Sequence, residues 1–135
     1  DWAGRSWIDV DLGEQYVRYF DASGNVLWES ACVSGAYGVH DTPLGVYSIY
    51  NKALDQTLLG NIVPETGKRE YETPVSYWIP FNDGVGLHDA NWQPDFGGSM
   101  YMSGYGSHGC INLPPSAAAE LYSLCSIGDV VVVHY

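Results

Sequence analysis

Basic residues are scarce in this sequence. Its 135 residues include 5 Lys and Arg against 16 Asp and Glu, which gives a formal net charge of −11 at pH 7. A chain with this charge repels a nucleic-acid backbone and an anionic lipid surface, because both are negatively charged. We therefore expect neither nucleic acid nor membrane contact for this segment.

Long apolar runs are also missing. The longest aliphatic run covers residues 130–133, whereas a membrane-spanning helix needs about 20 apolar residues. The chain opens on an acidic residue, Asp1, with no signal-peptide pattern behind it. We expect residues 1–135 to form one domain cut from a longer exported protein, whose export signal or anchor lies outside this sequence.

Cysteine occurs three times, at positions 32, 110 and 125. The spacings are wide and irregular, which excludes a dense disulfide framework and a zinc finger built from cysteine pairs. Cys32 lies in a strand-like segment and Cys125 near the end of an expected helix, where a free cysteine usually behaves as a small buried hydrophobe. We interpret both as structural, which leaves Cys110 as the candidate for chemistry.

The remaining composition favours a compact, mainly β protein. Hydrophobic residues make up 46% of the chain, with 16 Gly, 11 Tyr and 5 Trp. Short, often alternating segments between Gly, Pro and Asp clusters predict strands over 7–12, 15–20, 26–28, 30–34, 46–50, 75–79, 85–88 and 130–134. A helix is predicted over 116–124, after Pro114-Pro115 and before Gly128.

Two segments do not follow this strand pattern. Residues 51–75 have no clean period, and we expect a short helix followed by a long surface loop that serves as a lid. The glycine-rich residues 89–106 are expected to be irregular. Both segments come before the part of the chain with the densest reactive side chains.

That cluster is Gly-Ser-His-Gly-Cys-Ile-Asn at residues 106–112. A cysteine thiol with a pKa of about 8.5 is mostly protonated at neutral pH, so a nucleophilic thiol needs a base or a cation nearby. All Lys and Arg lie at or before position 69, and beyond it only His88, His108 and His134 take up a proton near neutrality. We therefore expect a histidine to activate Cys110.

The residues around Cys110 offer further catalytic groups. His108 and Cys110 stand at i and i+2, which share one face of an extended strand. His88 ends an extended segment, and either the Asp89 side chain or a main-chain carbonyl can hold its second ring nitrogen. Gly109 lets the backbone approach a substrate, and the N–H groups of Gly109 and Cys110 can stabilise an oxyanion.

These residues also carry a resemblance to a known family. His88, a gap of 18 residues and then Ser107-His108-Gly109-Cys110-Ile111-Asn112 resemble the signature of the L,D-transpeptidase catalytic domain, the YkuD family. Thr42-Pro43-Leu44-Gly45-Val46-Tyr47 is similar to the family's Thr-Pro-x-Gly-x-Tyr/Phe block, and residues 8–12 are similar to its opening strand. Residues 77–81 and 88–92 look most like Gram-positive members. The resemblance spans nearly the whole chain and implies a compact β-sandwich or barrel-like domain with one short helix after the catalytic motif.

The resemblance also implies roles for the motif residues. Cys110 would be the nucleophile and His88 its general base, oriented by the main-chain carbonyl of Asp89. His108 would be secondary, shaping the site or steadying the thiolate, and Gly109 would contribute its backbone. We assign to substrate binding Ser107, Asn112, Tyr77, Trp78 and Trp92, although Ser107 and Asn112 also suit a local structural role and the aromatic rings also suit the core.

The implied reaction is acyl transfer without a cofactor or metal. The thiolate attacks the bond after the third residue of a peptidoglycan tetrapeptide stem, releases D-Ala and leaves a thioester. An amine of a second stem then gives a 3→3 cross-link, whereas water gives a trimmed tripeptide, the L,D-carboxypeptidase alternative. The resemblance further implies acylation of Cys110 by carbapenems and an extracellular, cell-wall location.

Two other interpretations stay open. A non-catalytic wall-binding β module would also explain the aromatic residues and glycines, although it does not need a cysteine beside two histidines. A zinc site built from His88, His108 and Cys110 would use suitable ligands, but the sequence offers no paired ligand spacing.

Overall fold

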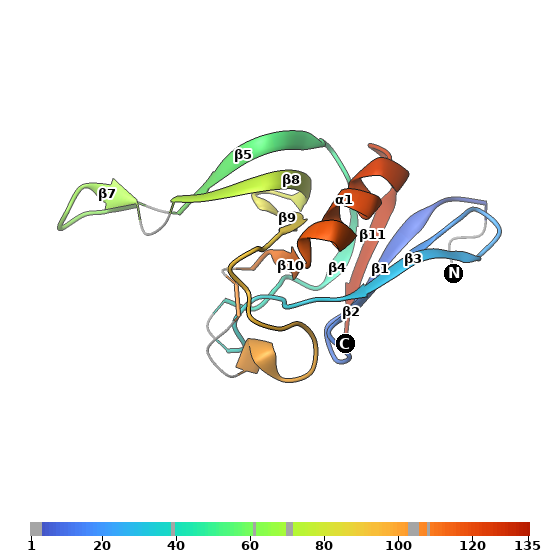
Figure 1. Ribbon diagram of the computed structural model, residues 1–135, viewed down its shortest axis with the longest axis horizontal. Helices are drawn as coiled ribbons and strands as arrows, with labels where there is room; N and C mark the ends of the chain where they lie inside the picture. Colours follow the sequence, from blue (N-terminus) through green and yellow to red (C-terminus); the bar gives the residue numbers. More distant parts are fainter. Residues whose placement is uncertain (1–3, 39, 61, 70–71, 103–105, 108) are drawn as a thin grey trace.

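The computed structural model describes residues 4–38, 40–60, 62–69, 72–102, 106–107 and 109–135. Within these residues the chain is mainly β, and two sheets carry most of the strands (Figure 1). In chain order the elements are β1 (Trp7–Asp11), β2 (Tyr16–Phe20), β3 (Val26–Ala31), β4 (Gly45–Ser48), β5 (Ala53–Leu59), β6 (Ile62–Val63), β7 (Lys68–Arg69), β8 (Glu72–Asn82), β9 (Val85–Asp89), the 3₁₀ helix η1 (Met100–Met102), β10 (Ile111–Leu113), α1 (Pro115–Leu124) and β11 (Val130–His134).

The first sheet has the strand order β3-β2-β1-β11-β4. Its central strand β1 alternates apolar and acidic residues, so Ile8 and Val10 are buried while Asp9 lies on the outer face. The C-terminal strand β11 pairs parallel with β1 and antiparallel with β4, which places the last strand of the chain inside the sheet. Its buried valines agree with the predicted closing strand.

The second sheet has the order β10-β9-β8-β5. Strands β8 and β9 form a hairpin whose turn residues Asp83 and Gly84 have φ angles of 35° and 88°. Two consecutive positive φ angles match the type I′ turn, whose twist suits a two-residue hairpin. Strand β10 pairs parallel with β9, with Asn112 opposite His88.

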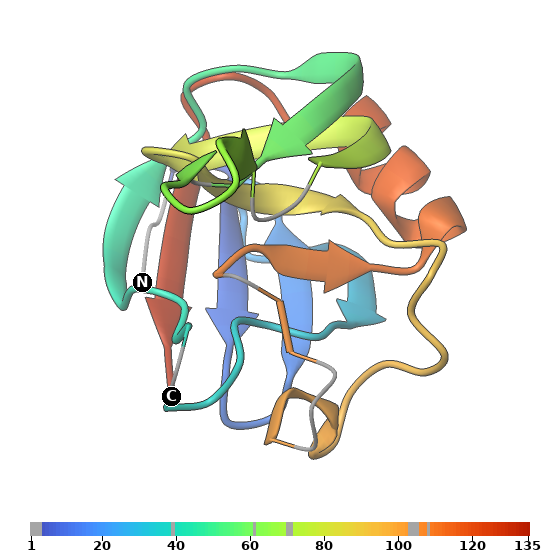
Figure 2. The same ribbon diagram turned by 90° about the vertical axis from the view of Figure 1, so that its left-hand side faces the viewer.

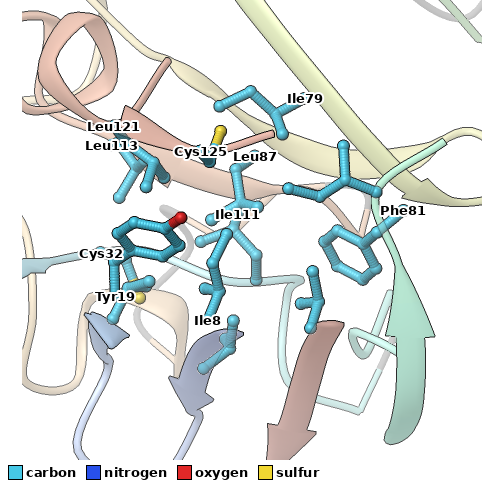
Figure 3. Close-up of a cluster of buried hydrophobic side chains, with 14 of the residues drawn as sticks. Ile8, Tyr19, Cys32, Ile79, Phe81, Leu87, Ile111, Leu113, Leu121 and Cys125 are labelled. Carbon is cyan, nitrogen blue, oxygen red and sulfur yellow. The ribbon is translucent and has the colours of Figure 1, made fainter. Parts of the chain in front are cut away.

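An apolar core fills the space between the sheets (Figure 3). Both sheets and α1 contribute to it, with Ile8, Tyr19, Cys32, Ile79, Phe81, Leu87, Ile111, Leu113, Leu121 and Cys125 among its members. All three cysteines are free thiols, and burial raises the pKa of both Cys32 and Cys125. The mainly β, sandwich-like fold is therefore confirmed, with Cys32 and Cys125 inside the core as expected.

Helix α1 lies close to its predicted position. It begins at Pro115, where proline costs no hydrogen bond, and ends when the Cys125 N–H bonds to the Leu121 carbonyl. The helix contacts β8, β9 and β3 and buries Ala118 and Leu121. No helix among the described residues is long and apolar enough to cross a bilayer.

The prediction for residues 51–75 was wrong. Instead of a short helix and a loop, β5 pairs antiparallel with the long strand β8, and β6 and β7 form a small hairpin beyond them. This small hairpin, which carries β7, projects away from the rest of the molecule (Figure 1). Because β5 is an edge strand with most of its residues exposed, it lacks the alternation that marks a half-buried strand. The lid role expected of this segment stays a prediction.

Asp9 on β1 and His134 on β11 form a hydrogen-bonded pair outside the motif. His134 Nδ1 lies 3.0 Å from the Tyr135 carbonyl oxygen and Nε2 lies 2.6 Å from Asp9 Oδ1. A carbonyl and a carboxylate both accept hydrogen bonds, so this arrangement favours the imidazolium with two N–H donors. The Tyr135 carbonyl first, and then Asp9, raise the pKa of His134 above its ordinary value.

We predict that Asp9→Asn lowers the pKa of His134, as measured by NMR titration of its ring. Because the folded-state pKa is raised, the pair stabilises the fold fully below the unfolded pKa of about 6.5 and loses this contribution as the pH rises through the folded value. An unchanged titration curve in Asp9→Asn would contradict the assignment of Asp9 as a partner.

Candidate active site

His88 is buried on β9 with one ring nitrogen held by the backbone. The preceding residue Leu87 points into the core, so the alternation of the strand places His88 on the outer face of the sheet. Its Nδ1 lies 2.8 Å from the main-chain carbonyl oxygen of Asp89. A carbonyl only accepts, so Nδ1 carries the hydrogen, and Nε2 of the neutral ring keeps its lone pair for accepting a proton.

The rings of two tryptophans lie close to the His88 ring. Trp78 stands opposite His88 in the β8–β9 register, with ring centroids 6.0 Å apart, and Trp92 lies 5.9 Å away. Burial lowers the pKa of His88, while the hydrogen bond to the Asp89 carbonyl and the Asp89 charge oppose this shift. The imidazole is therefore neutral at neutral pH and available as a base.

Cys110 stands just before β10, next to the turn between β8 and β9. Its Sγ lies 3.6 Å from the Gly84 carbonyl oxygen, which accepts the thiol hydrogen. Burial raises the pKa of the Cys110 thiol to about 11, and a backbone hydrogen bond from Gly86 opposes this only in part. The isolated thiol would thus stay protonated at neutral pH, so its reactivity depends on a proton acceptor.

Cys110 and His88 lie on the same face of the sheet. Ile111 points into the core opposite Leu87, so Cys110 before it and His88 after Leu87 both point to the outer face. The pairing of Asn112 with His88 sets Cys110 two residues back along the neighbouring strand. For ideal strands about 4.8 Å apart with about 3.3 Å per residue, this offset corresponds to about 8 Å between the two Cα atoms, a separation that the two side chains can bridge. Figure 2 views this face, with β8, β9 and β10 in front of the first sheet.

Ser107 ties the backbone around the cysteine into a tight loop. Its hydroxyl donates to the Cys110 carbonyl and accepts the Gly109 N–H at 3.1 Å. Gly109 itself has a φ of 120°, a conformation that side-chain-bearing residues rarely adopt. Because the Gly109 N–H is already bonded, the oxyanion donor expected here is the Cys110 N–H, which has no acceptor among the described residues.

Residues 33–36, which we call the bracing segment, hold the motif from the other side. Val33 exchanges two backbone hydrogen bonds with Asn112, and Ser107 bonds to Ser34 and Ala36. The backbones of Gly106 and Ala36 lie close together, since a Cβ on Gly106 would collide with the backbone of Ala36. The described residues of the motif are therefore held between β9 and the bracing segment.

Of the other predicted site residues, Asn112 lies at the site and Tyr77 lies away from it. Asn112 is buried beside His88, and its Nδ2 donates to Gln93 Oε1 at 3.1 Å, which ties it to the loop after β9. Tyr77 is not brought to the site: it lies on the opposite face of β8 from Trp78, with its ring 5.4 Å from that of Tyr122 on α1.

The Asp89 carboxylate has a separate partner set. It accepts the backbone N–H groups of Ser76 and Tyr77 at 2.9 and 2.8 Å, so only its main-chain carbonyl holds His88. His108 lies outside the described residues, and the proposed zinc set that includes it is therefore not tested. Among the residues that the structure describes, no group of three His, Cys, Asp or Glu side chains is placed to hold a metal ion.

Two contributors to the site were not identified as such from the sequence. The Asp83-Gly84 pair signals a hairpin turn, but only the fold brings the Gly84 carbonyl to the sulfur. Thr42 belongs to the Thr-Pro block that carries part of the resemblance, yet its hydroxyl lies 2.8 Å from the Gly109 carbonyl oxygen. Both contacts join residues far apart along the chain, so no local pattern could reveal them.

Comparisons with known proteins give a consistent result. The chain matches the family profile of the L,D-transpeptidase catalytic domain, YkuD, over residues 5–133. A crystal structure of an Enterococcus faecium L,D-transpeptidase mutant is 41% identical, with a TM-score of 0.87 over 98% of this chain and 50% of that chain. No curated protein sequence matches the chain significantly.

Two solution structures from Enterococcus faecium cover the catalytic domain alone. The first is 42% identical, with a TM-score of 0.82 over 97% of this chain and 98% of that domain. The second, acylated by ertapenem, is 42% identical, with a TM-score of 0.81 over 96% of this chain and 97% of that domain. This chain thus spans about half the length of the crystallised enterococcal protein. Given the match to the family profile and the identity to an L,D-transpeptidase over nearly all of its residues, the chain belongs to the L,D-transpeptidase catalytic domain family.

Proposed function

We propose that this chain is the catalytic unit of a cysteine L,D-transpeptidase that forms 3→3 cross-links between peptidoglycan stems at the cell wall, outside the cell. One observation carries the proposal: the half-buried Cys110 thiol lies on one sheet face with the neutral His88 imidazole, whose Nε2 has no hydrogen-bond partner among the described residues. Family membership supports the same chemistry.

The first half-reaction makes a thioester. The Cys110 proton moves to His88 Nε2, the sulfur bonds to the carbonyl carbon of the donor stem, and the carbonyl π electrons move to the oxygen. The Cys110 N–H stabilises that oxyanion. When the carbonyl reforms, the C–N bond breaks, and the departing D-Ala amine takes the proton from His88.

The second half-reaction runs the same steps in reverse. His88 accepts a proton from the amine of an acceptor stem as that amine attacks the thioester, and the sulfur leaves as the thiol after taking the proton back. A β-lactam carbonyl offers the same electrophile. Because a relative was solved acylated by ertapenem, we include carbapenems among the acyl donors for Cys110.

Incubation with a purified tetrapeptide stem, followed by mass spectrometry, tests this function. We expect release of D-Ala together with a cross-linked stem dimer. A tripeptide product without a stem dimer would show that the enzyme is a carboxypeptidase and does not cross-link stems. Stem binding without D-Ala release would favour the non-catalytic wall-binding module.

A further inference from the structure

Thr42 connects the loop before β4 to the residue that precedes the nucleophile. Its side chain is buried, with 4% of the residue exposed. The hydroxyl accepts the Gly35 N–H at 2.9 Å and donates to the Gly109 carbonyl oxygen at 2.8 Å. A hydroxyl has one hydrogen, and the Gly35 contact uses a lone pair, so that hydrogen is committed to Gly109.

The Gly109 carbonyl belongs to the peptide group that also contains the Cys110 N–H. In a trans peptide the C=O and the N–H point in opposite directions. A partner that holds the carbonyl therefore fixes the direction of the N–H as well. Such a partner matters here, because glycine restricts the rotation of its neighbouring peptide less than other residues do.

The N–H groups of Ser107 and Gly109 already have acceptors, so the Cys110 N–H is the donor whose direction matters. The Gly109 N–H is bonded to Ser107 Oγ at 3.1 Å. The Ser107 N–H is bonded to the Ser34 carbonyl at 2.9 Å. Of the three described N–H groups of Ser107, Gly109 and Cys110, that of Cys110 is thus the one with no acceptor among the described residues.

We infer that Thr42 is a positioning residue for acyl transfer: its hydroxyl holds the Gly109–Cys110 peptide so that the Cys110 N–H faces the oxyanion of the acylation step. The inference rests on the function proposed above. It assigns to the Thr-Pro block a role in catalysis that is separate from its place before β4. Thr42 itself contacts the backbone of the motif rather than the substrate.

The test compares two reactions of the same sulfur. Acylation by ertapenem passes through an oxyanion, whereas alkylation by iodoacetamide displaces iodide and forms none. The variant Thr42→Val keeps the shape of the side chain and removes the hydroxyl, and Thr42→Ser keeps the hydroxyl. Tyr19→Phe is a matched control, because it removes a partly buried hydroxyl bonded to Asp129 at 2.8 Å, away from the motif.

Thr42→Val is expected to lower the rate constant of acylation by about 10- to 100-fold, less than the roughly 10²- to 10³-fold loss for deleting an oxyanion donor. Its rate of alkylation should stay close to that of the unmodified protein. Thr42→Ser should recover most of the acylation, and Tyr19→Phe should lower the melting temperature without changing the ratio of the two rates.

Two results would overturn the inference. One is unchanged acylation in Thr42→Val, and the other is an equal loss of acylation and alkylation, which would make Thr42 a structural support of the loop only. Failure of the unmodified protein to react with ertapenem, while iodoacetamide still labels Cys110, would instead count against the proposed function. The reaction of the unmodified protein with ertapenem therefore distinguishes a failure of this inference from a failure of the proposed function.

Discussion

A Cys110→Ala variant is expected to form no acyl-enzyme and to release no D-Ala from a tetrapeptide stem. Removing the nucleophile from an enzyme of this kind lowers turnover by about 10⁴-fold or more. The other two thiols cannot replace it, because Cys32 and Cys125 are 0% and 2% exposed inside the core. Mass spectrometry of the intact protein after incubation with ertapenem gives the readout.

The matched control for this prediction is Cys125→Ala. It also removes a thiol whose pKa burial raises to about 11, but from the end of α1 rather than from the motif. This variant should form the acyl-enzyme with unchanged stoichiometry. Continued D-Ala release by Cys110→Ala would exclude Cys110 as the nucleophile.

The second large effect is expected for His88→Ala. General-base catalysis by a positioned side chain contributes about 10²- to 10⁴-fold, and a loss of this size is expected in kcat/KM for the stem. Because burial lowers the pKa of His88, its neutral form persists to below pH 6.5. The activity of the unmodified protein should therefore decline only as the pH falls below that value, when the imidazole becomes protonated.

His134→Ala is the matched control, because it removes an imidazole with a raised pKa from β11. Its turnover should stay within about 3-fold of the unmodified protein, since surface substitutions away from the chemistry have small effects. If His88→Ala were nearly normal and His108→Ala inactive, the general base would have been assigned to the wrong histidine.

Much of the fold follows from local patterns. Strand β1 alternates clearly because one face is buried, and α1 begins at a proline and presents Ala118 and Leu121 to the core at helical spacing. Strand β5 gives no such signal, since an exposed edge strand has no face that must be apolar. Its position depends on pairing with β8, which the sequence of β5 does not encode by itself.

The candidate site likewise has residues that the sequence identifies and residues that only the folded structure places. Residue types singled out Cys110 and pointed to a histidine as its activator, because few other groups can activate a thiol in the cation-poor half of the chain. The choice of His88 among the histidines came from the family resemblance. Trp78 and Tyr77 are adjacent aromatic residues, and only the register with β9 decides that Trp78 lies beside His88 while Tyr77 packs on α1. Residue type alone does not distinguish them.

The contacts that hold the motif were outside the reach of sequence reasoning. Thr42 binds Gly109 across 67 positions. The bracing segment adds main-chain hydrogen bonds, which depend on backbone position and leave no trace in side-chain type. Long-range backbone contacts of this kind require the folded structure.

The central claim is that His88 accepts the proton of Cys110, and the pH dependence of iodoacetamide alkylation of Cys110 tests it most directly. The unmodified protein should show fast alkylation at pH 7 and a decline below pH 6.5 as His88 becomes protonated. In His88→Ala the reaction should be slow at pH 7 and rise only in the alkaline range, toward the thiol pKa of about 11. Superimposable profiles for the two proteins would contradict the assignment of His88 as the base.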